Sequence, residues 1–203
     1  MKVAKKRLDY TFFENTDVVE LAKMLLGKVI CTNINGIYCE AMITETEAYA
    51  GRNDKACHAH MGRFTNRTSM MYEQGGKAYV YLCYGIHHLF NIVSNKKGQA
   101  DAVLIRSVEP VSGLKYMMER RNVTKVSPQV FAGPGKISQA LGISKKYNSE
   151  DLVVSEELFV VDHEIQINDI VSTTRIGIDY AEEDALLPWR FYISGNKYVS
   201  HPI

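Results

Sequence analysis

The dipeptide Asn35-Gly36 stands between two runs of apolar and β-branched residues, and it constrains the fold more than any other feature of the chain. Asn and Gly both tolerate the positive φ angles of the tight turn that joins two antiparallel strands. Residues 29–34 and 37–43 are therefore expected to pair as a β-hairpin, with the second strand continuing towards Tyr49.

Similar patterning predicts the other elements. Further strands are expected at 78–84, 89–93, 102–108, 159–161, 165–173 and 190–193, the third of them ending at Pro110. Helices are expected over 17–26 and 111–121, and from Gly133 to about Leu141. Because hairpins outnumber β-α-β crossovers, we expect an α/β (α+β) fold: one domain over residues 1–203 with a curved, mostly antiparallel sheet and flanking helices. The first ten or so residues are expected to form a basic, poorly ordered N-terminal arm.

Charge is distributed unevenly along the chain, although the formal net charge is only +1. Residues 51–148 hold 15 basic and 5 acidic side chains, a net +10, whereas residues 149–203 hold 3 and 11, a net −8. The basic middle either faces a phosphate backbone or is neutralised by the acidic tail folding back onto it. Both interpretations stay open at this point.

Several features favour a soluble, cytoplasmic protein. The longest apolar runs, such as 103–105, are too short to span a bilayer, and the basic start is not followed by a signal-peptide pattern. The four cysteines include no Cys-x-x-Cys pair, so we expect four reduced thiols.

Residues 50–76 form a polar, Gly-containing stretch of 27 residues with neither helical nor strand periodicity. Loops of that length inside a compact domain are usually functional, so this stretch is expected to contribute to a site.

The strand that leads into this loop carries two carboxylates and a phenol. Glu45, Glu47 and Tyr49 alternate and so share one strand face. If that face points inward, a buried carboxylate there suits general-base activation of water; if it points outward, the acids are a solvated surface. Arg106, which follows an apolar run, is expected to pair with a carboxylate, and Glu47 is a plausible partner.

Cys57, His58 and His60 are residue types that bind zinc, but their spacing matches none of the usual metal motifs. One functional histidine among incidental ones is the favoured interpretation. Tyr79, Tyr81 and the turn residue Tyr84 either stack on bases or form an aromatic part of the core.

Taken in order, these blocks strongly resemble the alkyladenine (3-methylpurine) DNA glycosylase family, from about residue 10 to 200. The resemblance rests on the runs Glu45–Tyr49, Asp54–Ala59, Gly62–Arg67, Tyr79–Gly85, Asn91, Arg106–Pro110, Gly133–Lys136 and Arg190–Tyr192. It implies a monofunctional enzyme that flips a damaged purine out of duplex DNA and hydrolyses its glycosidic bond, leaving an abasic site. No metal, other cofactor or covalent lysine intermediate is expected.

The resemblance also implies roles for individual residues. Glu47 resembles the general base that activates water, and Arg106 resembles the residue that holds Glu47 and that water, with the backbone carbonyl of Ile178 as a third contact. Arg63 and Arg67 fall in a block expected to contact DNA.

The pocket residues follow from the same resemblance. Tyr49, His58 and Tyr81 resemble the walls that sandwich the flipped base, and Tyr84 resembles the wedge that fills the vacated stack. Asn91 resembles the side chain that disfavours normal guanine. The implied substrates are 3-methyladenine, 7-methylguanine, hypoxanthine and ethenoadenine, which the sequence does not rank.

Three other functions account for part of this pattern. A non-catalytic damaged-DNA-binding protein of the same fold would not need Glu47 and Arg106 together, and a metal-dependent hydrolase would use Cys57, His58 and His60. A plain interaction module would leave the long loop at 50–76 unexplained. The expected protein is therefore a monomer whose partner is double-stranded DNA, with no membrane or protein partner implied, located in the cytoplasm (with the nucleoid if bacterial).

Overall fold

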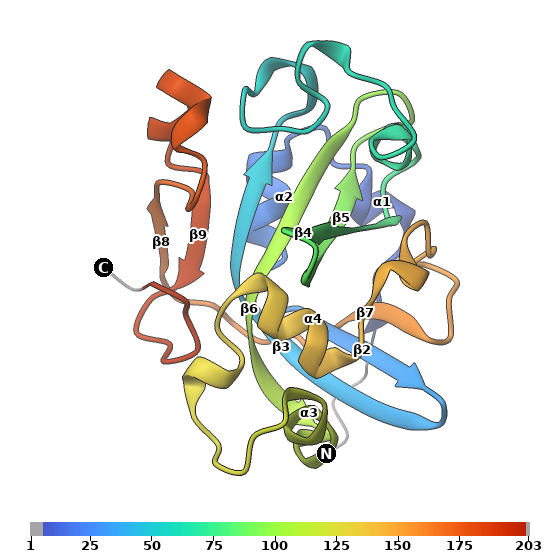
Figure 1. Ribbon diagram of the computed structural model, residues 1–203, viewed down its shortest axis with the longest axis vertical. Coiled ribbons are helices and arrows are strands. Elements are labelled where there is room, and N and C mark those ends of the chain that lie inside the picture. Colours follow the sequence, from blue (N-terminus) through green and yellow to red (C-terminus); the bar gives the residue numbers. More distant parts are fainter. Residues whose placement is uncertain (1–5, 202–203) are drawn as a thin grey trace.

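The computed structural model describes residues 6–201, and within them nine strands form one open antiparallel sheet (Figure 1). The strand order is β1-β7-β2-β3-β6-β5-β4, with β9 paired to β3 and β8 paired to β9. The strands are β1 (Lys6–Arg7), β2 (Val29–Ile34), β3 (Ile37–Tyr49), β4 (Ala78–Cys83), β5 (His87–Ser94), β6 (Asp101–Ser112), β7 (Leu158–Asp162), β8 (Ile170–Thr173) and β9 (Arg190–Ile193). The α/β class and the mostly antiparallel sheet expected from the sequence are confirmed.

The helices within residues 6–201 are short. Four are α-helices: α1 (Tyr10–Phe13), α2 (Val18–Met24), α3 (Leu114–Arg121) and α4 (Pro134–Leu141). Six are 3-10 segments: η1 (Gly51–Asn53), η2 (His60–Gly62), η3 (Ser69–Tyr72), η4 (Pro128–Val130), η5 (Lys145–Tyr147) and η6 (Asp179–Leu186).

Strand β3 changes partner along its length, and this change places the site. Its first half pairs with β2 through the Asn35-Gly36 turn, as the sequence predicts. Its second half, at Glu45–Glu47, pairs with β9 on one side and β6 on the other. The register with β6 shifts on either side of Glu45, which marks a β-bulge there. Residues 45–47 are consequently enclosed by strands on both edges, and all three are fully buried.

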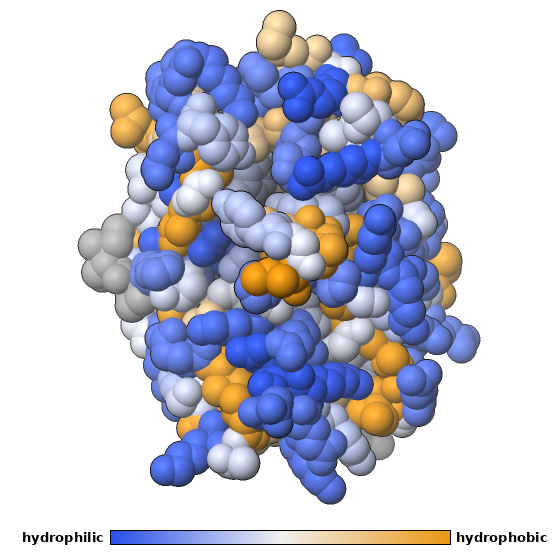
Figure 2. All heavy atoms as spheres, viewed as in Figure 1, coloured by the Kyte–Doolittle hydropathy of each residue, from blue (hydrophilic) through white to orange (hydrophobic). Residues whose placement is uncertain are grey.

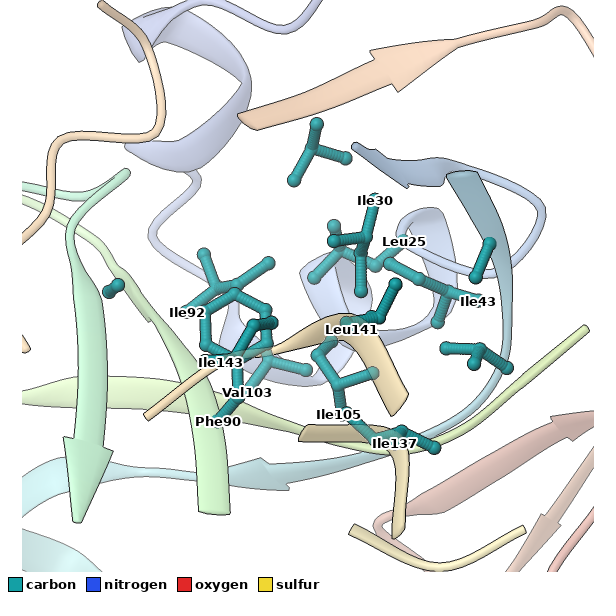
Figure 3. Packing of buried hydrophobic residues seen from close by; sticks show 14 of the residues in the cluster. Leu25, Ile30, Ile43, Phe90, Ile92, Val103, Ile105, Ile137, Leu141 and Ile143 are labelled. Atoms are coloured by element: carbon teal, nitrogen blue, oxygen red, sulfur yellow. The ribbon is translucent and has the colours of Figure 1, made fainter. Parts of the chain in front are cut away.

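One apolar cluster joins the sheet to helices α2 and α4 (Figure 3). Asp17 caps α2 by accepting hydrogen bonds from the backbone of Val19 and Glu20, and the helix buries Val18, Leu21 and Ala22. Helix α4 begins at Pro134, whose fixed φ suits a first helical position, and buries Ile137 and Leu141. Figure 3 shows Leu25, Leu141 and Ile105 meeting in this cluster. Helix and sheet thus share one core, which fixes the frame around the site.

Two predicted strand boundaries were wrong. β6 does not end at Pro110 but runs on to Ser112, because Pro110 lies opposite Ala41 next to a register irregularity, where no ladder hydrogen bond from its nitrogen is required. The run at 165–173 is a strand only over its last part, β8, since only those residues find a partner in β9. Helix α3 likewise begins at Leu114 rather than at residue 111, after Gly113 in a left-handed conformation.

Residues 6–10 are ordered, whereas the sequence predicted a poorly ordered N-terminal arm over about the first ten residues. Lys6 and Arg7 form β1 against β7, and Asp9 caps α1, which begins at Tyr10. The Arg7 side chain donates to the Leu152 carbonyl at 3.1 Å, an anchor far away in the sequence. Residues 1–5 lie outside the described residues.

No helix in the described part of the chain is long and apolar enough to cross a membrane. On the face shown in Figure 2, apolar residues gather at the centre, over the β4–β5 hairpin, among hydrophilic ones. Leu82 and Ile86 of this hairpin are 43% and 71% exposed.

Candidate active site

A cavity of about 760 Å³ opens where β3, β6, the β4–β5 hairpin, the 50–76 loop and the segment before η6 converge. Ten residues are expected from the family resemblance to take part in the site, and eight of them line the cavity: Tyr49, His58, Arg67, Tyr81, Tyr84, Asn91, Arg106 and Ile178. Of the other two, Glu47 lies directly behind the lining, and Arg63 is exposed on the surface of the long loop. The structure therefore gathers nearly all the predicted site residues around one cavity.

Glu47 is fully buried and is held by three residues that line the cavity. Its Oε1 accepts a hydrogen bond from the backbone N–H of Ile176 at 2.8 Å and lies 3.2 Å from Arg106 Nη1. Its Oε2 accepts a hydrogen bond from the Tyr49 hydroxyl at 2.8 Å. The carboxylate is thus fixed in orientation by residues of the cavity wall.

Arg106 connects Glu47 to a second buried carboxylate, Glu45. Arg106 Nε donates to Glu45 Oε1 at 3.0 Å, and Arg190 Nη1 donates to the same oxygen at 2.8 Å. We call Glu45, Glu47, Arg106 and Arg190 the four-charge cluster. Two carboxylates and two guanidinium groups balance one another there, which is what allows four charges to be buried.

Hydrogen bonds complete the surroundings of Glu45. The hydroxyls of Ser107 and Ser200 each donate to it at 2.7 Å, and so does the backbone N–H of Ser200. Burial alone would raise the pKa of the Glu45 carboxyl, but the charge of Arg106 and these hydrogen bonds outweigh it and hold the pKa below its ordinary value. Glu45 therefore stays ionised.

His58 is held as a neutral imidazole. Its Nε2 lies 3.2 Å from Arg67 Nη2, and its Nδ1 lies 2.9 Å from the Tyr79 hydroxyl. Because an arginine only donates, Nε2 is the acceptor and Nδ1 carries the proton. Burial, together with the charges of Arg67 and Arg63, lowers the pKa of His58 to about 4. The ring meets Tyr81 edge-on, with 4.8 Å between centroids.

Tyr49 is fixed from behind by a buried ion pair that sequence reasoning missed. Arg175 lies 4.8 Å from the Tyr49 ring centroid and donates to Asp54 Oδ1 at 2.8 Å. Asp54 also accepts from the backbone N–H groups of Ala50 and Ala56, so the same pair shapes the start of the long loop. The sequence offered one indication of this ion pair: Arg175 is one of only three lysines and arginines in the acidic tail, residues 149–203.

The β4–β5 hairpin carries Tyr84 at its tip. Tyr84 has φ +49° and Gly85 has φ +74°, and the Tyr84 side chain is 92% exposed. Asn91, on the next strand, is buried, and its Nδ2 donates to the carbonyl of Tyr79 at 3.1 Å. The hairpin thus presents a protruding aromatic side chain beside a fixed amide.

Ile178 lines the cavity just before η6, and its carbonyl accepts a hydrogen bond from Ala181 N–H at 2.8 Å. Within residues 6–201, no group of three or more His, Cys, Asp or Glu side chains is arranged to hold a metal ion. None of the four cysteines, all of which lie within the described residues, forms a disulfide, and three of them are buried.

The acidic tail folds back onto part of the basic middle, as one of the two interpretations of the charge pattern expects. Acidic residues of the tail pair with lysines of the basic middle: Lys55 with Glu183 at 2.8 Å, and Lys77 with Asp151 at 2.7 Å. Arg67, by contrast, lines the cavity. The tail therefore neutralises some of the basic residues, while arginine charge remains at the cavity.

Comparison with known proteins identifies close similarity over almost the whole chain. A family model described as methylpurine-DNA glycosylase (MPG) matches residues 11–197. A protein of Natranaerobius thermophilus named "Putative 3-methyladenine DNA glycosylase" is 46% identical over 196 residues, covering 96% of this chain and 98% of that relative. Proteins of the same name from Clostridium perfringens strain 13 and Chlamydia felis are 45% and 44% identical, over 93% and 94% of this chain and 96% and 97% of their own lengths.

Replacing Glu45 with Ala should lower the free energy of unfolding by about 3–5 kcal/mol, because it leaves the buried guanidinium of Arg190 without its carboxylate and removes one of the two carboxylates of Arg106. Urea unfolding at neutral pH measures this.

The control is Glu20→Ala, which removes an exposed pair with Lys23 at 3.7 Å and should cost less than about 1 kcal/mol. Because folding lowers the pKa of Glu45, its contribution is present above the ordinary carboxyl pKa and is lost as the pH falls through the folded-state pKa. A Glu45 variant as stable as the control would contradict this account.

The imidazole of His58 should stay neutral with the proton on Nδ1 down to about pH 4, well below the ordinary histidine value of 6.5. Nitrogen-15 NMR of the folded protein reports both the tautomer and the titration midpoint. A midpoint near 6.5, or a proton on Nε2, would show that the hydrogen bonds with Tyr79 and Arg67 do not form as described.

Proposed function

The chain belongs to the methylpurine-DNA glycosylase family, and from this premise we propose that it flips a damaged purine out of duplex DNA and cleaves its N-glycosidic bond with water. As a member of this family it is a DNA glycosylase, a hydrolase acting in DNA repair. The observation that best supports the finer proposal is Glu47, a buried carboxylate held by Arg106 and the Ile176 amide at the wall of a cavity that can receive a base.

The proposed chemistry assigns two tasks to Glu47. As the base departs, positive charge develops on the sugar, and a nearby carboxylate stabilises that charge while accepting a proton from the attacking water. Arg106 keeps the carboxylate oriented through their 3.2 Å contact, and the Ile178 carbonyl offers a further acceptor for the water. The Tyr49 hydroxyl donates to Glu47 Oε2, and because a carboxylate oxygen can accept more than one hydrogen bond, the attacking water can donate to the same carboxylate.

The proposed base pocket uses the aromatic walls of the cavity. Tyr49, His58 and Tyr81 surround the space in which a flipped purine would stack, and purines alkylated on a ring nitrogen carry a positive charge that strengthens stacking on tyrosine. Asn91, fixed by its bond to Tyr79, would meet the exocyclic amine of normal guanine unfavourably. The substrates that fit are 3-methyladenine, 7-methylguanine, hypoxanthine and ethenoadenine.

The proposed DNA contacts lie at the mouth of the cavity. Tyr84 protrudes from the hairpin and would fill the gap that the flipped nucleotide leaves in the stack. Arg63 and Arg67 belong to the long loop and would approach the phosphate backbone. The partner is double-stranded DNA containing a damaged purine, bound by a monomer in the cytoplasm or, in a bacterium, at the nucleoid; no cofactor enters the scheme.

Replacing Glu47 with Gln should reduce the single-turnover rate of base excision by about 10²–10⁴-fold, because the amide keeps the shape of the side chain but cannot accept a proton from water. Affinity for lesion-containing duplex, measured by gel shift, should stay nearly unchanged. The matched control is Glu20→Gln, the same chemical change on an exposed side chain, which should excise at the parental rate. Equal rates in the Glu47 variant and the control would remove Glu47 from the mechanism. Binding by the parent without any excision would favour a non-catalytic damaged-DNA-binding protein.

Replacing Tyr84 with Ala should weaken base flipping by about 5- to 150-fold, the range expected for losing one aromatic stacking partner. Stopped-flow fluorescence of a base analogue beside the lesion measures extrusion directly. Tyr116→Ala serves as the control, since Tyr116 is an exposed tyrosine on α3. Normal extrusion in the Tyr84 variant would count against its role as the wedge.

A further inference from the structure

Arg67 occupies an unexpected place for a residue of an exposed loop. Its guanidinium lies over the ring of Tyr81, 4.8 Å from the centroid, and donates to His58 Nε2 at 3.2 Å. Both partners are walls of the cavity, and Arg67 itself lines it. The guanidinium therefore sits at the aromatic surface on which a flipped base would stack, rather than only at the outer rim.

The charge of Arg67 is not balanced by the carboxylates of the site. Glu45 and Glu47 pair with Arg106 and Arg190, and Asp54 pairs with Arg175. His58, its hydrogen-bond acceptor, is neutral. A base entering the cavity consequently meets a positive charge next to Tyr81.

This charge acts differently on the two chemical classes of damaged purine. A neutral base with ring or carbonyl acceptors, such as hypoxanthine, can accept a hydrogen bond from a guanidinium. A purine alkylated on a ring nitrogen is itself a cation, and two like charges a few ångströms apart repel each other even though Arg67 is also reached by solvent. The cationic base is therefore bound less favourably beside Arg67, whereas the neutral base can share the pocket with it.

We propose that Arg67 is a specificity-determining residue, which shifts the preference of the enzyme towards neutral damaged purines and away from cationic alkylated ones. The inference rests on the proposed function. Cationic bases are the better leaving groups and are therefore excised faster once bound. A charge that disfavours their binding reduces the difference in excision rate between cationic and neutral damaged purines. In this account Arg67 acts inside the pocket in addition to any contact with phosphate.

The test compares kcat/KM for two duplexes at neutral pH and constant salt, one carrying hypoxanthine and the other 7-methylguanine. Arg67→Met should raise the ratio of 7-methylguanine to hypoxanthine excision by about tenfold, because it removes the repulsion while keeping an unbranched side chain. Arg67→Lys keeps the charge and should leave the ratio near that of the parent. The matched control is Arg63→Met, from the same loop but not among the residues that line the cavity, which should lower both rates equally.

Three results would overturn the inference. The first is an unchanged ratio in Arg67→Met, which would give Arg67 the same uniform phosphate role as Arg63. The second is a ratio that moves towards hypoxanthine in that variant. The third is an equal shift in Arg67→Lys and Arg67→Met, which would show that the charge is not the cause. Failure of the proposed function is distinguishable from all three, because the parent would then excise neither base.

Discussion

The pairing of two buried carboxylates with two buried arginines is the interaction on which the rest of this structure depends. Glu45, Glu47, Arg106 and Arg190 are each no more than 5% exposed. Burying charges is costly, and removing one member of a buried pair costs more than the pair contributes, so the cluster is stable only when all four members are present. It connects β3, β6 and β9, three strands that meet in the middle of the sheet. The fold and the proposed catalytic carboxylate are therefore specified by the same contacts.

A second buried pair, Asp54 with Arg175, extends this control to the loops. It holds the start of the long 50–76 loop, the ring of Tyr49 and the segment that supplies the Ile176 amide to Glu47. Two stretches separated by more than a hundred residues are thereby fixed relative to β3. Long loops can form the walls of the cavity and still have fixed positions, because buried charged contacts hold the ends of these loops against the sheet.

Local sequence patterns correctly predicted the turns and helix starts that depend on neighbouring residues. The Asn35-Gly36 turn, the capped helix α2 and the Pro134 start of α4 all depend on neighbours within a few residues, and all were found where expected. The predicted end of β6 at Pro110 was wrong, because a strand can continue through a proline only where the pairing register allows it. That register, opposite Ala41, is not visible in any local pattern. In the site, alternation placed Glu45 and Glu47 on one face, and both reach Arg106. The roles of Arg175, Ser200 and Arg190 could not be predicted, since their partners lie far away in the sequence and meet only in the folded chain.

The four-charge cluster and the aromatic cavity beside it are proposed to remove a damaged base from DNA with water and without a metal ion. The most direct measurement is single-turnover incubation with a duplex carrying one hypoxanthine, with and without EDTA, followed by alkaline cleavage of abasic sites. The account predicts equal strand cleavage in both samples. Cleavage that disappears with EDTA would contradict it, and so would no cleavage with hypoxanthine, 3-methyladenine or ethenoadenine duplexes.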